Sequence, residues 1–299
     1  MDKMRTRKNR NKIGGAAISG AEGCVIIPSL LSVGFLRSTR SATHVTKLFY
    51  EKSTYDKEKG NNDTINAFDP TNSFTYVKYD EKPIDFSKLS ADEKSICVKN
   101  IKNGAPIETL KHLNYVFGGQ SLFSCGENRS QISNKKSSDI LNSIANLLPH
   151  VIAMNQKGLY HNDLNDGNIL YNQNNKKAYL IDFSGLTKVS TKHPLCDIMA
   201  LLNATKTFAF KLDQGTDFPV QLRTLLQEFY TELEPALKRI AANADTPEQQ
   251  SIAYTTIVSE FNDFCKRYSD TVPYSGGKKT LRHKRHGNMH RLKLVNRKP

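Results

Sequence analysis

Two carboxylates and one amide stand in this chain at spacings that suit the transfer of a phosphoryl group. Four residues separate Asp163 from Asn168, and Asp182 follows the apolar run 178–181. Two short strands joined by a tight turn at 172–175 would bring Asp182 back beside Asn168. One carboxylate would then lie near an incoming hydroxyl, while the other and the amide oxygen could hold the metal ion on ATP.

These residues belong to two longer motifs. The first, at 161–170, reads His-x-Asp-x-x-x-x-Asn-Ile-Leu, and the second, at 181–183, reads Ile-Asp-Phe. Together they resemble the catalytic and metal-binding loops of the protein-kinase-like superfamily. The resemblance implies that Asp163 orients or deprotonates the acceptor hydroxyl, while Asn168 and Asp182 hold Mg²⁺. It also implies that the histidine of the first motif braces the loop and is not itself a catalyst.

An N-terminal stretch resembles the nucleotide-binding half of the same family. Gly20, Gly23 and Val25 match the pattern Gly-x-x-Gly-x-Val, whereas Ile18 stands where the family has its first glycine. Glycines allow backbone amides to approach phosphate oxygens, because no Cβ is in the way. Lys47, in Val-Thr-Lys, resembles the strand lysine that contacts the α- and β-phosphates of ATP.

An acidic partner for that lysine and an adenine-binding hinge would complete the nucleotide site. Glu58, on an expected short helix at 54–60, is the preferred partner; Glu51 is closer in sequence but would lie on or just past the same strand. Phe117 and Gly118 end an apolar strand that resembles the hinge of the family, where backbone groups could bond an adenine edge. A plain strand followed by a turn is the alternative interpretation of that segment.

Further short matches resemble kinase-like proteins of large DNA viruses. They are the Val-Thr-Lys strand, Asp69-Pro70, the Gly-Gly of the hinge and a basic Gly-Gly-Lys-Lys at 276–279. Other positions depart from ordinary protein kinases. Asn162 replaces the arginine that normally pairs with a phosphorylated activation loop, so control by such phosphorylation is not expected. Asp197 follows Asp182 after only 15 positions, and no Ala-Pro-Glu is present.

Three functions remain open from these motifs. The leading interpretation is an ATP- and Mg²⁺-dependent enzyme that resembles a Ser/Thr protein kinase and phosphorylates a protein hydroxyl. The short segment after Asp182 favours instead a small-molecule kinase, because aminoglycoside and choline phosphotransferases share the same motifs. A nucleic-acid-binding pseudokinase adaptor is the third. A catalytically inactive protein would not need the four motif residues that this chain retains, which are Lys47, Asp163, Asn168 and Asp182.

The order of expected elements predicts an α+β fold. The resemblance implies a two-lobed protein-kinase-like fold, with a β-rich N-lobe at 13–118, a mainly helical C-lobe at 119–274 and ATP between them. Apolar patterns predict short strands at 24–27, 44–50, 74–79 and 114–117. They predict helices at 91–101, 138–157, 194–211, 219–242 and 247–267, with a polar loop at 126–137.

The net charge of +14 is concentrated at the two ends of the chain. Residues 1–12 contain six Lys or Arg and one acid, and residues 275–299 contain nine Lys or Arg and no acid. The remainder, 13–274, contains 28 residues of each sign. The ends are therefore expected to be a disordered basic arm and a disordered basic tail, which could bind nucleic acid weakly or could serve solubility alone.

Cysteine usage and hydropathy bear on the compartment. The five cysteines are scattered without a Cys-x-x-Cys pair, which predicts a reducing compartment and neither a zinc site nor a disulfide framework. A basic start followed by an apolar stretch interrupted by Gly, Ser and Glu does not fit a signal peptide. No membrane span is expected. The expectation is an intracellular protein that is not secreted, in the host cytoplasm or the virion if the chain is viral.

Overall fold

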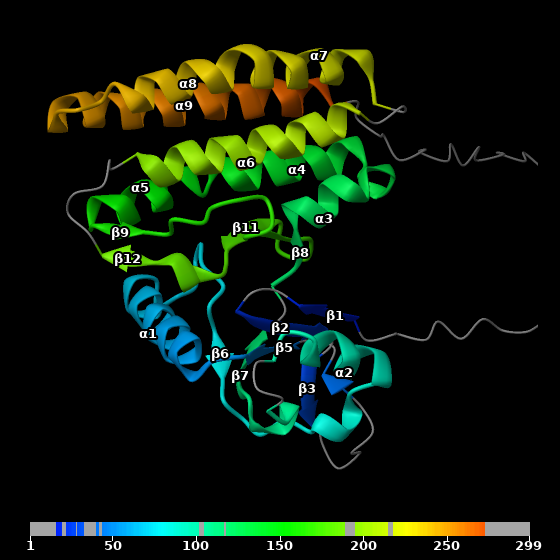
Figure 1. The fold of residues 1–299 in the computed structure, drawn as a ribbon. Helices are drawn as coiled ribbons and strands as arrows, with labels where there is room; N and C mark the ends of the chain where they lie inside the picture. Colours follow the sequence, from blue (N-terminus) through cyan, green and yellow to red (C-terminus); the bar gives the residue numbers. More distant parts are fainter. Residues whose placement is uncertain are drawn as a thin grey trace, which may run out of the picture.

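The computed structural model describes residues 16–19, 22–27, 29–32, 40–41, 44–101, 105–116, 118–188, 195–214 and 218–272. These residues form an α+β fold, as the sequence predicts, with a small antiparallel sheet followed by a mainly helical part (Figure 1). We refer to 16–116 as the sheet part and to 118–272 as the helical part. The expected basic arm and tail lie outside the described residues, as do Gly20 and Phe117.

The sheet part is built on five antiparallel strands in the order β1-β2-β5-β7-β6. In that order the strands span Ala16–Ser19, Gly23–Ile27, His44–Phe49, Lys111–Val116 and Tyr79–Asp80. A separate pair of strands consists of β3 (Ser29–Ser32) and β4 (Arg40–Ser41). Two helices belong to this part, α1 (Lys52–Phe68) and α2 (Ala91–Val98).

The two-residue period of the strands decides which side chains enter the core. Cys24 is in register with Leu48, and both are fully buried in one cluster with residues of α2. Val25 is in register with Lys47, and both line a cleft on the other face of the sheet. A shift of one residue in register would exchange these two sets.

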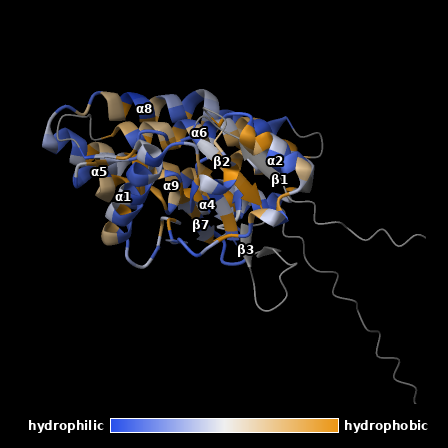
Figure 2. Ribbon diagram, turned by 60° about the horizontal axis from the view of Figure 1, so that its bottom comes forward, coloured by the Kyte–Doolittle hydropathy of each residue, from blue (hydrophilic) through white to orange (hydrophobic). Residues whose placement is uncertain are grey.

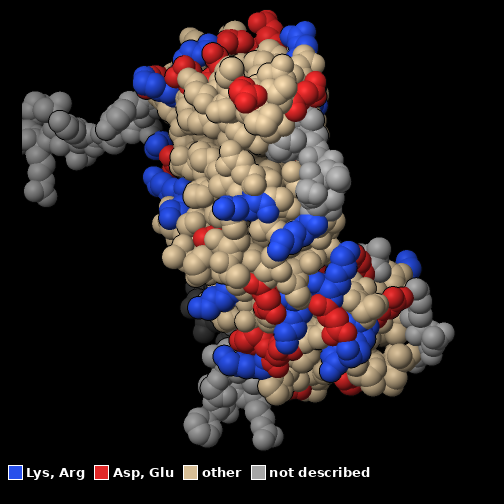
Figure 3. Space-filling model, turned by 90° about the vertical axis from the view of Figure 1, so that its left-hand side faces the viewer, with Lys and Arg blue, Asp and Glu red and all other residues tan. Residues whose placement is uncertain are grey.

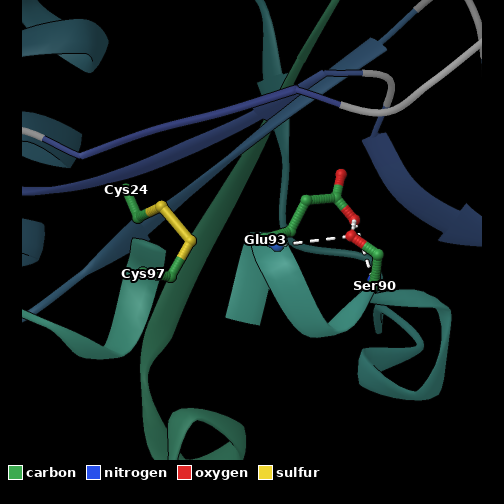
Figure 4. The surroundings of a disulfide bond; sticks show 4 residues. All are labelled: Cys24, Ser90, Glu93 and Cys97. Atoms are coloured by element: carbon green, nitrogen blue, oxygen red, sulfur yellow. Dashed lines mark hydrogen bonds between the residues drawn. A yellow bond between two sulfur atoms is a disulfide. The ribbon is translucent and has the colours of Figure 1, made fainter. Parts of the chain in front are cut away.

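A disulfide joins Cys24 of β2 to Cys97 of α2 (Figure 4), so the prediction that no disulfide forms was wrong. Both residues are fully buried, and 73 positions separate them in sequence, which is why spacing gave no signal for the pair. The helix that carries Cys97 begins with a capping box. Ser90 Oγ accepts the backbone N–H of Glu93, and the Glu93 carboxylate accepts the N–H of Ser90.

The helical part stacks helices over a small set of short strands (Figure 1). Its helices are α3 (Leu122–Glu127), α4 (Asn134–Ala145), α5 (Leu148–Gln156), α6 (Cys196–Asp213), α7 (Val220–Glu228), α8 (Glu234–Ala242) and α9 (Pro247–Thr271). Its strands are β8 (Gln120–Ser121), β9 (Leu159–Tyr160), β10 (Ile169–Asn172), β11 (Lys177–Leu180) and β12 (Thr187–Lys188). Hydrophilic and hydrophobic residues alternate along the helices (Figure 2), as expected for helices with one buried face.

The expected helix at 138–157 is two helices, α4 and α5, separated at 146–147. Pro149 lies in the first turn of α5. Because proline has no backbone N–H, it cannot continue the hydrogen bonds of α4, but it is tolerated near a helix start. The expected loop at 126–137 is shorter than predicted, since α3 ends and α4 begins within it.

The segment 74–79 is not the strand that its apolar residues predict. The Asp69 carboxylate accepts the backbone N–H groups of Ser73, Phe74 and Thr75 at 2.9–3.1 Å. Those N–H groups are therefore not available to a neighbouring strand. What remains is an isolated bridge between Thr75 and Leu180 and the two-residue strand β6.

The described surface carries both signs of charge. Lys and Arg are interspersed with Asp and Glu on the face drawn in Figure 3, particularly over the sheet part. Several form ion pairs, such as Lys59 with Glu81 at 2.6 Å and Arg267 with Glu228 at 2.7 Å. Among the described helices, none combines the length and the apolar character that crossing a membrane requires.

Candidate functional site

The predicted hairpin is present and brings Asp182 beside Asn168. Strands β10 and β11 pair antiparallel from Ile169–Leu180 to Asn172–Lys177, and Ile181 N–H donates to the Asn168 carbonyl at 3.0 Å. Asp182 follows directly with φ of 58°, in the left-handed region that Asp tolerates better than most residues. That backbone conformation turns the chain out of the strand into the short helix Phe183–Gly185.

The side chain of Asp163 is held by two amides of its own loop. Asn168 Nδ2 donates to Asp163 Oδ2 at 3.0 Å and to its carbonyl at 2.8 Å. Asn165 Nδ2 donates to Asp163 Oδ1 at 3.1 Å. Because the nitrogen of the Asn168 amide is used in this way, its oxygen is the atom that could take a metal ion. Asp163 and Asn168 are thus brought together as predicted.

Asp197, at the start of α6, braces the loop from inside the protein. It is 1% exposed, and its carboxylate accepts the N–H of His161 at 2.7 Å and the N–H of Asn162 at 3.1 Å. Asn155 Nδ2 adds a third hydrogen bond at 2.8 Å. A buried carboxylate with three donors holds the loop backbone in one conformation.

His161 is buried behind the loop. Its Nδ1 accepts the N–H of Asp163 at 3.3 Å, so Nε2 carries the proton and donates to the Ile181 carbonyl at 2.9 Å. Burial lowers the pKa of His161 below its ordinary value. The imidazole therefore stays neutral and links the loop of Asp163 to the hairpin that ends at Asp182.

Lys47 lies between two carboxylates from different parts of the chain. Its Nζ is 2.5 Å from Glu58 Oε2 on α1 and 3.5 Å from Asp182 Oδ1. Burial disfavours the ammonium, but Asp182 and Glu58 outweigh burial and raise the pKa of Lys47. Burial likewise acts to raise the pKa of Asp182, but Lys47 and the hydrogen bonds from Ser184 lower it overall. The predicted pairing of Lys47 with Glu58 is present, on a longer helix than expected.

One face of α1 reaches three parts of the site. Glu58 contacts Lys47, Asn61 Nδ2 donates to the Phe183 carbonyl at 2.7 Å, and Asn62 Nδ2 donates to the Tyr115 hydroxyl at 2.9 Å. Positions 58, 61 and 62 share a helix face because of the 3.6-residue period. Sequence reasoning missed Asn61, Asn62 and Tyr115. The expected helix ended at residue 60, whereas α1 continues to Phe68, and the spacing of Asn61 and Asn62 from Glu58 was the available signal for those two.

Several of these groups line a cleft of about 800 Å³ between the sheet part and the helical part. Val25, Val45, Leu170 and Ile181 supply apolar walls, whereas Lys47, Glu58, Asn168 and Asp182 supply charged and polar groups. Asp163 does not line the cleft itself but is bonded to Asn168, which does. A flat apolar ligand with a charged end would match this division of the lining.

Close contacts or backbone conformation explain why three positions that line the cleft are glycines. A Cβ on Gly23 would lie 2.1 Å from the Leu48 carbonyl oxygen, so strand packing requires a glycine there whatever the cleft binds. A Cβ on Gly118 would lie 2.7 Å from Leu170 Cδ1. Gly119 has φ of 129°, which L side chains rarely adopt. The chain can therefore pass close to the cleft before entering β8.

The arrangement fits a magnesium ion that arrives with a nucleotide. Asp182 and Asn168 offer one carboxylate and one amide oxygen in the cleft. Mg²⁺ is commonly bound by one or two protein oxygens, with phosphates and waters completing its shell. Among the described residues no cluster of three or more His, Cys, Asp or Glu could hold a metal by itself. A phosphate-bound ion is thus the kind that suits this pair.

Fold and site together define an α+β protein with an apolar-walled cleft that carries a bridging lysine and two carboxylates. The lysine comes from the sheet, one carboxylate from α1 and the other from the turn after β11. No known protein-family model matches this chain, and no curated protein matches it in sequence.

Proposed function

We propose that the protein is an ATP- and Mg²⁺-dependent phosphotransferase with a two-lobed protein-kinase-like fold, which phosphorylates an alcohol hydroxyl, in the first place a Ser or Thr of a protein. The N-lobe would be 13–118 and the C-lobe 119–274. One observation carries the proposal. The ammonium of Lys47 lies between Glu58 and Asp182 in a cleft that also contains Asn168, which is bonded to Asp163.

Each residue would have a distinct role in the transfer. Lys47 would place a fixed positive charge at the ATP phosphates, and Asp182 and Asn168 would hold Mg²⁺. The ion, when bound, would neutralise charge on the transferred phosphoryl group. Asp163, with both oxygens fixed by amides, would orient the acceptor hydroxyl and accept its proton. Catalysis would consist mostly of positioning and charge stabilisation.

The adenine would lie between the apolar walls of the cleft. Val25 and Val45 line it from the sheet, and Leu170 and Ile181 line it from the hairpin. The backbone at Gly118 and Gly119 would bond the edge of the base. Burial of a flat ring against these side chains contributes about 25 cal/mol for each Å² of apolar surface removed from water.

A small-molecule hydroxyl is the second candidate acceptor. Strand β12 ends at Lys188 after pairing with β9, and α6 begins at Cys196. Only the short segment 189–195 joins them, which is little chain with which to build a docking surface for a peptide. This observation favours a compact acceptor such as an amino sugar or an amino alcohol.

Transfer of labelled phosphate from ATP to protein acceptors and to small alcohols tests the proposal directly. Asp163→Asn should reduce transfer by ~100-fold or more and leave Mg-ATP binding nearly intact, because a proton acceptor is lost. Asp182→Asn should reduce both the transfer of phosphate and the binding of Mg-ATP. Asp139→Asn is the matched control, because Asp139 pairs with Lys135 at 2.8 Å and does not line the cleft.

The outcomes separate the candidate functions. Labelled small alcohol without labelled protein would select the second acceptor class. Mg-ATP binding without any transfer would point to a pseudokinase adaptor. Full activity of either Asp163→Asn or Asp182→Asn would contradict the assignment of that residue.

A further inference from the structure

The two oxygens of Glu58 have different partners, and only one of them is a charged group. Oε2 accepts from Lys47 at 2.5 Å, and Oε1 accepts from the Tyr115 hydroxyl at 2.6 Å. The Tyr115 oxygen in turn accepts from Asn62 Nδ2 at 2.9 Å. A continuous chain of hydrogen bonds therefore runs from α1 through β7 and back to α1 before it reaches the lysine.

Lys47 has a second carboxylate within reach. Asp182 Oδ1 is 3.5 Å from Nζ, compared with 2.5 Å for Glu58. If Glu58 swung away, the nearest remaining anion for the buried ammonium would be Asp182. A closer Lys47–Asp182 pair would occupy the carboxylate that is assigned to the metal ion. The position of Glu58 therefore decides whether Asp182 is available.

We propose that Tyr115 is a positioning residue, whose hydroxyl, held by Asn62, keeps Glu58 on Lys47 and so leaves Asp182 for the metal. This inference rests on the proposed function, because it uses the roles assigned there to Lys47 and Asp182. It adds a third element to the ion pair. Tyr115 and Asn62 also line the cleft, and strand β7 then controls the geometry of Lys47 through the hydrogen bond from Tyr115 to Glu58.

The surroundings make the hydroxyl the decisive atom of this side chain. Glu58 is 2% exposed, so an oxygen that loses its donor cannot turn to solvent for a replacement. Tyr115 also packs its ring near Tyr79, with centroids 6.3 Å apart. Replacement by phenylalanine keeps that ring packing and removes the hydroxyl alone. A change on substitution thus reports the hydrogen bond.

The test compares Tyr115→Phe with the wild-type protein in Mg-ATP binding and turnover. A buried acceptor that loses its donor should cost about tenfold, so the KM for Mg-ATP and the half-saturating Mg²⁺ concentration should each rise by about tenfold. The KM for the acceptor should stay unchanged. Tyr79→Phe is the matched control. The Tyr79 hydroxyl donates to Asp63 at 2.6 Å, and Asp63 lies on α1, as Glu58 does, but outside the cleft. Loss of that hydroxyl should change these constants by less than about twofold.

A double-mutant cycle distinguishes positioning from a general structural effect. If Tyr115 acts through Glu58, the variant with both Glu58→Gln and Tyr115→Phe should bind Mg-ATP no more weakly than Glu58→Gln alone. Losses that multiply would overturn the inference. Asn62→Ala leaves Tyr115 intact and should weaken Mg-ATP binding in the same direction. It serves as the second variant if Tyr115→Phe does not fold.

The result remains informative if phosphoryl transfer is absent. A wild-type protein that binds Mg-ATP without transfer would refute the proposed function, whereas weaker binding by Tyr115→Phe would still support the positioning role. Equal Mg-ATP affinity of wild type and Tyr115→Phe would overturn the role even in an active enzyme. A wild type that does not bind Mg-ATP at all would overturn both.

Discussion

Opening the disulfide between Cys24 and Cys97 should destabilise the sheet part strongly. The bond closes a loop with a sequence separation of 73 residues. In the chain-entropy treatment of cross-links, closing a loop of that length lowers the entropy of the unfolded chain. This raises the free energy of unfolding by about 4 kcal/mol at 25 °C. The expected loss is therefore a large share of the stability of an ordinary domain.

The site should respond to the same change. Cys24 lies between Gly23 and Val25, which line the cleft, and α2 packs against β1 and β2. Without the covalent bond, the β1–β2 hairpin is held to α2 by packing alone. We therefore expect weaker Mg-ATP binding in the reduced protein, beyond the change in its melting temperature.

Thermal unfolding measures the effect. Protein refolded in dithiothreitol should melt lower than oxidised protein by roughly 8–16 °C, since about 1 kcal/mol corresponds to 2–4 °C at this chain length. A variant with Cys24→Ala and Cys97→Ala is the control. Its melting temperature should be low both with and without dithiothreitol. Equal melting of oxidised and reduced wild-type protein would refute the reasoning, because the bond would then contribute no constraint.

Three further outcomes are expected. Asp197→Ala should cost about 3–5 kcal/mol in urea unfolding, because three donors lose a buried carboxylate; a loss under about 1 kcal/mol would contradict the bracing role. The depressed pKa of His161 means that the folded state binds fewer protons than the unfolded state below pH 6.5. Stability should therefore be full above that pH and fall below it, and His161→Gln should lessen the slope by up to about 1.4 kcal/mol per pH unit; an unchanged slope would count against a neutral His161. Finally, all of the excess charge lies in 1–12 and 275–299, so any DNA or RNA binding should be weak, fall steeply with salt and disappear in a 13–274 variant; affinity that survives this truncation would locate the binding surface elsewhere.

The sequence by itself determined the parts of the site that are local in the chain. The hairpin between Asn168 and Asp182 follows from two apolar runs and a polar turn. It forms as two antiparallel strands, with the turn at 173–176, one residue later than predicted. Asp163 and Asn168, with four residues between them, have their side chains in hydrogen-bond contact. Such features depend on strand period and turn chemistry, which few neighbours can override. The choice of Glu58 needed the family resemblance as well, because Glu51 is closer to Lys47 in sequence.

Tertiary structure alone decided the contacts that join distant segments. Cys24 meets Cys97 because helix α2 packs against β2, and the side chains of both residues are buried in the cluster between them. Tyr115 meets Glu58 over 57 positions, and Asp197 meets His161 over 36. No spacing rule reaches so far, since packing of whole elements sets these distances. The motif thus identified groups that lie together at the cleft, and the packing of α1 and β7 determined how Lys47 is held.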